Sequence, residues 1–112
     1  MNQYTELASV ETSIENAKVA IELGQSLTRL RDNPDFKKLF ERKFFIDESV
    51  RLVQKSGGIE ALDPTVEKQI HRNMQAIAGT QNFLAKVEQD ALQAAMELTD
   101  GELAREEILN EG

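Results

Sequence analysis

The sequence contains no cysteine and no tryptophan, and it has one tyrosine and two prolines among 112 residues. Without cysteine, the chain has neither a disulfide framework nor a thiolate metal site. Strands are enriched in aromatic residues, so their scarcity argues against a β-sandwich or barrel. Leu, Ala, Glu, Lys and Gln are plentiful, and these residues favour helix. We therefore expect one all-α domain over residues 1–112.

Long apolar runs are also missing. No stretch approaches the length that crosses a bilayer, and the N-terminal residues MNQYTELASVE lack the basic and apolar regions of a signal peptide. We therefore expect no membrane contact and a cytoplasmic location.

The chain lacks an overall positive charge. It has 13 basic and 20 acidic residues, a net charge of −7, which opposes general binding to the phosphate backbone of nucleic acids. The charge is unevenly spread: residues 1–28 carry −3, residues 29–55 carry +3 and residues 56–112 carry −7. A basic middle can attract an acidic end, either within one molecule or between neighbours.

The first helix is predicted over residues 3–30. Its apolar or small residues recur in alternating steps of three and four, which is typical of a helix packed on another helix. Gly24 lies within this stripe and costs about 1 kcal/mol relative to alanine. We interpret it as a point of close helix approach; a hinge is the alternative. The stripe consists of Leu7, Val10, Ile14, Ala17, Ile21 and Gly24.

Residues 33–55 hold four of the five phenylalanines and six of the 13 basic residues. Asn33 is a natural N-cap, and Pro34 then takes the first helical position. The pattern shifts at residues 45–47. Residues 47–49 either cap a new helix after a bend or lie in a helix that runs through with a change of face, and we favour the bend. Residues 56–58, Ser-Gly-Gly, predict a helix end with a left-handed glycine cap.

A second long helix is predicted from Pro64, capped by Asp63, to about Leu98. Its seven-residue repeat predicts a left-handed coiled-coil seam, which Asn73 and Thr80 dilute. The repeat consists of Ile70, Ile77, Leu84, Ala91 and Leu98. Thr99 with Glu102 resembles a capping box, which predicts a separate short helix over residues 103–109.

Catalytic patterns are absent from the sequence. His71 is the only histidine, and Glu67, four residues earlier, offers a surface ion pair and not the pocket that a general base needs. Adjacent acidic residues on a helix point in different directions, and no lysine-serine or lysine-threonine pair follows Gly57 and Gly58. We expect no catalytic residue, metal site, cofactor or small-molecule substrate, and hence no enzyme.

The basic stretch offers the only candidate interaction surface: Arg31, Lys37, Lys38, Arg42, Lys43, Phe45 and Arg51. Phenylalanines among basic residues can stack on nucleic-acid bases. Helical spacing and five interspersed acids favour instead a solvated face over an aromatic core. Phe45 lies off the main stripe and would mark a contact surface if exposed. The predicted core consists of Phe36, Leu39, Phe40, Phe44, Ile70, Ile77 and Leu84.

Several short motifs resemble those of small helical proteins encoded in the head and packaging gene module of tailed bacteriophages. They are NPDFKKLF at 33–40, Phe44-Phe45, Glu48, Arg51-Leu52-Val53 and REEIL at 105–109. The resemblance covers about residues 27–111 and departs at Val50, where alanine is more usual, and at Phe44, where glycine is more frequent. It implies no activity. It implies a virion or assembly component with phage structural proteins as partners, located in the virion or the host cytoplasm.

From these patterns we expect two long antiparallel helices with the Phe-rich element packed across one end of the pair. The favoured function is a non-enzymatic structural or assembly protein, capsid-associated or scaffold-like, that acts through helix–helix contacts. A hairpin within one chain and a homo-oligomeric bundle fit the seam equally well. The alternatives are a nucleic-acid-binding accessory, small-terminase-like or single-strand binding, that uses residues 29–55, and a regulator that binds a host protein through residues 99–112.

Overall fold

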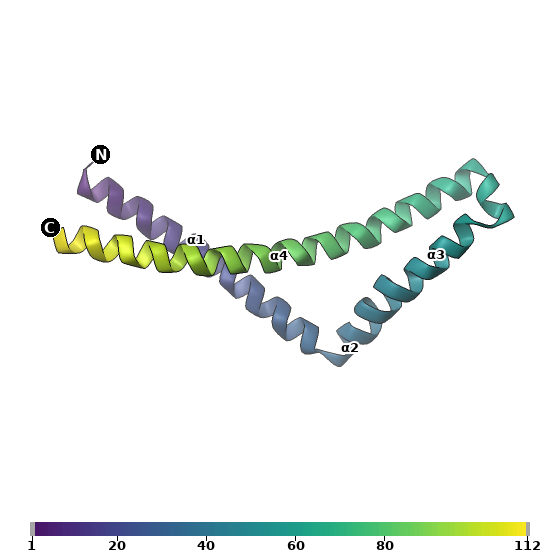
Figure 1. Cartoon of the computed structure of the whole chain (residues 1–112), viewed down its shortest axis with the longest axis horizontal. Coiled ribbons are helices and arrows are strands. Elements are labelled where there is room, and N and C mark those ends of the chain that lie inside the picture. Colours follow the sequence, from purple (N-terminus) through teal and green to yellow (C-terminus); the bar gives the residue numbers. More distant parts are fainter. Residues whose placement is uncertain (1, 112) are drawn as a thin grey trace. The chain divides into compact units, whose positions relative to one another are not determined.

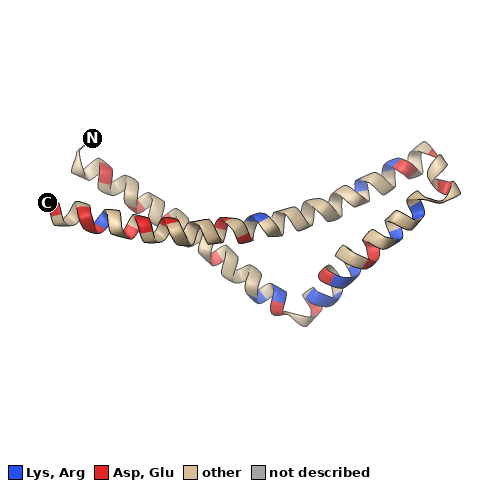
Figure 2. Ribbon diagram, in the orientation of Figure 1, with Lys and Arg blue, Asp and Glu red and all other residues tan. Residues whose placement is uncertain are grey.

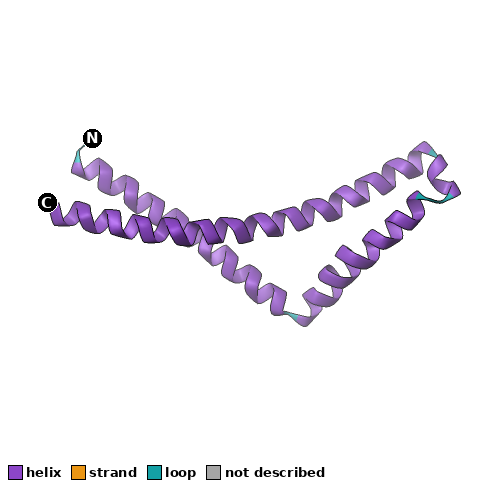
Figure 3. Ribbon diagram, viewed as in Figure 1, coloured by secondary structure: helices purple, strands orange, loops and turns teal. Residues whose placement is uncertain are grey.

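A computed structural model describes residues 2–111, and every element in that range is a helix (Figures 1 and 3). The all-α prediction is therefore confirmed for the described range. The elements are α1 (Gln3–Asp32), α2 (Pro34–Phe36), the π-helical segment η1 (Lys37–Asp47), α3 (Glu48–Ser56), the 3₁₀ turn η2 (Ile59–Leu62) and α4 (Pro64–Glu111).

The chain forms two compact units. Unit 1 combines Met1–Thr28 with Lys86–Gly112, and unit 2 comprises Arg29–Ala85. That residues 1–112 form a single domain stays a prediction, and Met1 and Gly112 lie outside the described residues. That the Phe-rich element packs across one end of the helix pair also stays a prediction.

In unit 1, α1 packs antiparallel to α4. Gly24 faces Ala91, and Ile14 faces Gly101. The residue numbers of the partners on α4 therefore decrease as those on α1 increase. Figure 1 shows the first turns of α1 beside the last turns of α4. A Cβ added to Gly24 would lie 2.4 Å from the Cβ of Ala91, which real contacts do not allow. The interpretation of Gly24 as a point of close approach is therefore confirmed.

The heptad seam on α4 continues beyond its predicted end. Side chains that are buried or half-buried recur in steps of four and three, which is the spacing of a helix packed along its length on another. In unit 1 these positions are Val87, Ala91, Ala94, Leu98, Gly101, Arg105 and Ile108, and Ala104 beside them is also half-buried.

The predicted break at Thr99, and with it the separate helix over residues 103–109, is wrong, because α4 is unbroken to Glu111. The hydroxyl of Thr99 donates to the carbonyl of Ala95 at 3.2 Å, one helical turn earlier, and so does not act as an N-cap. Gly101 lies against Ile14 of α1, where a Cβ would be 2.9 Å from that side chain. The glycine therefore serves helix packing and does not end the helix.

The predicted starts of the later helices are confirmed by their caps. The side-chain oxygen of Asn33 accepts hydrogen bonds from the backbone N–H groups of Asp35 (2.8 Å) and Phe36 (3.2 Å). Asp63 accepts one from Thr65 at 2.8 Å. Each bond satisfies a donor that the first helical turn leaves unpaired.

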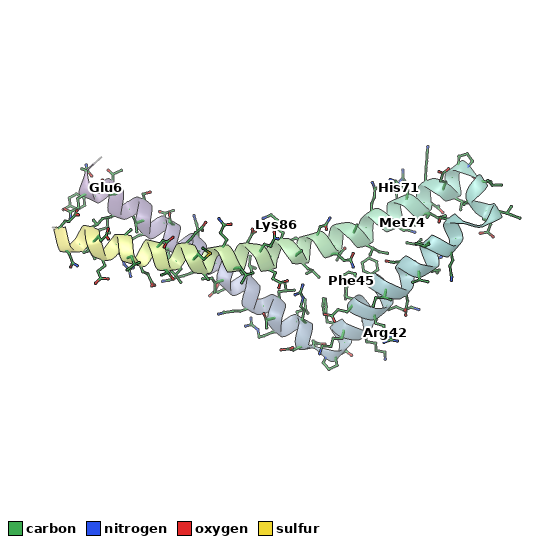
Figure 4. The ribbon with its side chains drawn as sticks, viewed as in Figure 1. Glu6, Arg42, Phe45, His71, Met74 and Lys86 are labelled. Carbon is green, nitrogen blue, oxygen red and sulfur yellow. The ribbon has the colours of Figure 1, made fainter. Side chains whose placement is uncertain are left out.

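The core of unit 2 forms where α3 and α4 face each other. Leu52, Ile70 and Ile77 are buried there. Half-buried side chains surround them: Phe44, Phe45, Ala61, Val66 and Met74. Figure 4 shows Phe45 and Met74 in the space between η1–α3 and α4. Ile70 and Ile77 thus occupy the core positions predicted for them.

The bend predicted at residues 47–49 is wrong, and the alternative of a helix that runs through is right. Asp47 has helical dihedral angles (φ −63°, ψ −44°) and makes no capping bond. The hydroxyl of Ser49 donates to the carbonyl of Phe45 at 2.7 Å. The helix does end at Ser56, but Gly57 and Gly58 keep negative φ angles (both −89°), so its end is not a left-handed cap.

Candidate partner-binding groove

The site begins with the π-helix η1, which spans eleven residues. Such helices are rare, occur mostly as single turns and are frequent at functional sites. Their hydrogen bonds join residues five apart, so each turn contains more residues than an α-helical turn. Residues spaced three and four apart lie on one face of an α-helix. In a π-helix the same residues therefore lie on different faces.

This rotation changes which side chains are buried. Phe36 is buried, and Phe44 and Leu84 are half-buried, in line with the predicted core. Leu39 and Phe40, however, are 59% and 42% exposed, so their assignment to the core is wrong.

Phe45, in contrast, turns inward. It was expected to mark a contact surface if exposed, but it is half-buried against the cluster of Leu52, Ile70 and Ile77. An α-helical spacing over residues 37–47 placed Phe40 in the core and Phe45 off the core stripe. In the structure Phe40 is exposed and Phe45 is half-buried against the core.

Phe40 is held firmly in its exposed position by the other rings. Its ring stacks on Phe36 with centroids 5.2 Å apart and an interplanar angle of 18°. It also meets the edges of Phe44 at 6.0 Å and Phe45 at 6.4 Å. Both arrangements are favourable for aromatic pairs, so Phe40 forms a preorganised apolar wall.

A groove of about 570 Å³ lies in unit 2 between η1–α3 and α4. One wall is formed by Leu39, Phe40, Lys43, Phe44 and Glu48, and the other by Asn73, Ala76 and Ile77. The lining is mostly apolar, with a few polar groups that can set orientation, as in many binding sites. The small side chain of Ala76 leaves room for close approach to α4.

Glu48 in the groove wall forms an ion pair with Arg51. The Nε of Arg51 donates to both carboxylate oxygens of Glu48, at 3.0 and 3.1 Å, and its Nη2 donates as well. This hydrogen bonding lowers the pKa of Glu48, and the positive charges of Arg51 and Lys43 act in the same direction against a desolvation effect. Arg51 therefore faces the Glu48 carboxylate in the groove wall as its ion-pair partner.

The groove includes only one residue of the basic candidate surface, Lys43. Lys37, Lys38 and Arg42 are exposed on η1 outside the groove, Arg31 is half-buried, and Arg51 pairs with Glu48. Figure 2 shows this stretch rich in Lys and Arg, whereas acidic residues dominate the end of α4. Figure 4 shows Arg42 pointing away from α4.

A second apolar surface was not predicted. Ile46, Val50 and Val53 are exposed and recur at i, i+4 and i+7, so they form a stripe along η1 and α3. The sequence did contain a signal for this surface. A helix with one apolar stripe that faces its own core and a second apolar stripe elsewhere indicates two contacts.

Other kinds of site find no support within residues 2–111. No group of three or more His, Asp or Glu side chains is arranged to hold a metal ion, and His71 is exposed. None of the helices described holds an apolar stretch long enough to cross a membrane.

Comparison with known proteins yields no relative: no protein-family model, no curated protein and no solved structure matches this chain.

Proposed function

We propose that this chain is a non-enzymatic structural or assembly protein of a tailed bacteriophage, capsid-associated or scaffold-like, that binds a protein helix in the groove of unit 2. The observation that carries the proposal is an apolar groove whose wall exposes Leu39 and Phe40, of which Phe40 is held by neighbouring rings. The phage setting is supported by the resemblance of the NPDFKKLF and REEIL motifs, with the virion or the host cytoplasm as its location.

A helix suits this groove because both walls are themselves helical. A third helix can place its side chains between the ridges of two neighbours and bury apolar surface on each. Full burial of a Leu or Phe side chain is worth roughly 1.5–3 kcal/mol. About half of that gain is still available at Leu39 and Phe40, because about half of each side chain is exposed.

The second candidate function is nucleic-acid binding through the basic surface, and the exposure of Lys37, Lys38 and Arg42 supports it. The aromatic geometry opposes it. Phe36 covers one face of Phe40, which leaves at most one face of that ring for a base. We therefore favour a protein partner.

The test of the protein-binding proposal uses purified head proteins encoded by genes adjacent to the gene for this chain. Their binding to the wild type, to Leu39→Asp and to Ile59→Asp is measured by titration calorimetry. Ile59 is also exposed but lies outside the groove, so it is the matched control. Leu39→Asp should weaken binding by about tenfold or more, the equivalent of 1.4 kcal/mol, and Ile59→Asp should not. The proposal would be contradicted if the wild type and both variants bound equally. It would also be contradicted if the neighbouring genes encoded no phage head proteins.

The nucleic-acid alternative has a separate test. Binding of single- and double-stranded DNA is measured over a range of salt concentrations for the wild type and for Lys37→Glu combined with Lys38→Glu. We expect weak binding. Tight binding that falls steeply with salt and is lost in the double variant would establish the alternative instead.

A further inference from the structure

The C-terminal half of α4 carries a second apolar stripe, which is exposed in the described part of unit 1. Leu92, Met96 and Leu103 are 67%, 70% and 55% exposed. In a heptad that begins at the seam residue Ala91, Leu92 holds the second position and Met96 and Leu103 the sixth. Both positions point away from the partner helix. Three large apolar side chains on an outward face indicate a further contact.

The charges of the two units are complementary. Unit 1 has twelve acidic and three basic residues, a net charge of −9, whereas unit 2 has eight acidic and ten basic residues, a net charge of +2. The stripe lies among the acidic residues of α4, with Asp100 and Glu107 near its face. The groove has Lys43 in its wall. Complementary charge steers association and fixes its orientation.

The exposed area is large enough for such contacts. The chain exposes 8490 Å² of accessible surface. A stable interface buries about 800 Å² on each partner. Two such interfaces would cover about 1600 Å² of that surface on each copy.

We propose that the occupant of the groove is the α4 stripe of a second copy of this chain. Leu92, Met96 and Leu103 of one copy lie against the wall formed by Leu39 and Phe40 of the next, and the acidic residues beside the stripe face Lys43. The proposed contact is head to tail: the groove of each copy takes the stripe of the next, and copies join into a ring or an open chain. The inference rests on the proposed function in that it names the partner of the same groove.

The test uses two variants that each remove one side of the contact. Leu39→Asp destroys the groove and keeps the stripe, whereas Met96→Asp destroys the stripe and keeps the groove. Light scattering gives the mass of each as concentration rises. The wild type should grow in mass with concentration and shrink with added salt. Either variant alone should show an association constant at least about tenfold lower, and Ile59→Asp should assemble like the wild type.

A mixture of the two variants gives the decisive result. One intact groove and one intact stripe remain, so the mixture should form dimers of twice 12.6 kDa and nothing larger. A mixture that stays monomeric overturns the inference, because the intact groove and the intact stripe would then not bind each other. A wild type that stays monomeric at every concentration also overturns it.

Two controls keep these outcomes interpretable. Circular dichroism checks that each variant is as helical as the wild type; if one is not, Leu39→Gln and Met96→Gln replace the pair. Failure here is separable from failure of the proposed function. If the chain stays monomeric but the groove variant loses binding to head proteins, only the self-association proposal is wrong. If the chain assembles head to tail but binds no head protein, only the proposed function is wrong.

Discussion

Gly24 and Ala91 mark a close contact between α1 and α4: a Cβ on Gly24 would lie 2.4 Å from the Cβ of Ala91. No ordinary carbon contact is that short, so the two helices can pack here only because residue 24 lacks a side chain. The contact sets the antiparallel register of unit 1, and it explains why a residue that weakens a helix lies within the apolar stripe.

We predict that Gly24→Ala destabilises the protein although alanine is the better helix former. The propensity gain is about 1 kcal/mol, but overpacking against Ala91 costs roughly 1–3 kcal/mol. The matched control is Gly79→Ala, also within a helix, where nothing lies within 4 Å of the added Cβ. This control should gain about 0.5–1 kcal/mol. Urea unfolding measures both changes, and equal stabilisation by the two substitutions would refute the close contact.

The core of unit 2 depends on Leu52, which is almost fully buried. Leu52→Ala should lower the free energy of unfolding by about 2–5 kcal/mol, because it removes buried apolar surface and leaves a cavity. Val53→Ala, at the exposed neighbouring position, should change it by no more than about 0.5 kcal/mol. Thermal and urea unfolding give both values. A similar loss for the two variants would mean that η1–α3 does not pack on α4 as described.

The cap at Asn33 offers a third prediction. Asn33→Ala removes an acceptor for the N–H groups of Asp35 and Phe36 and should cost about 1 kcal/mol. Asn82→Ala, at an exposed position inside α4, should be neutral or slightly stabilising because alanine favours helix. Asn33→Asp should retain most of the stability, since its carboxylate accepts the same bonds. If Asn33→Ala proved as harmless as Asn82→Ala, the cap would have no role in stability.

The pKa of Glu48 should depend on Arg51. The folded-state pKa is lowered, chiefly by the hydrogen bond from Arg51. The stabilising contribution is therefore present above the pKa of the unfolded chain and is lost as the pH falls through the folded-state pKa. Arg51→Gln should raise the pKa of Glu48 towards its ordinary value, as read from an NMR titration of its side-chain carboxyl carbon. Lys86→Gln, which removes a different ion pair, should leave it unchanged. The pairing is wrong if both variants give the wild-type curve.

Local signals in the sequence predicted most of the helix ends. Asn33 with Pro34 and Asp63 with Pro64 each combine a side-chain acceptor with a residue that fits the first turn, so both starts were predicted to the residue. The seam was equally predictable, because burial on a long helix must repeat at the spacing of its turns.

The groove could not be predicted, because it depends on the π-helical form of η1. No residue type marks a π-helix, and Phe36 and Phe40 fit an α-helical stripe equally well. Once the turn widens, Phe40 faces solvent and Phe45 faces the core. Thr99 misled for a related reason. The sequence at Thr99 matches a capping box, but the seam residue Gly101 packs on Ile14. This tertiary packing favours one continuous helix.

The most direct measurement is the reactivity of a single thiol in the groove wall. The chain contains no cysteine, so Leu39→Cys provides one reporter and Ile59→Cys, exposed outside the groove, its control. The dilute Leu39→Cys protein should react rapidly with a thiol reagent, and its rate should fall as its own concentration or that of a head protein rises. The Ile59→Cys rate should stay constant. A Leu39→Cys rate that is unchanged under every one of these conditions would contradict the claim that this groove binds a helix.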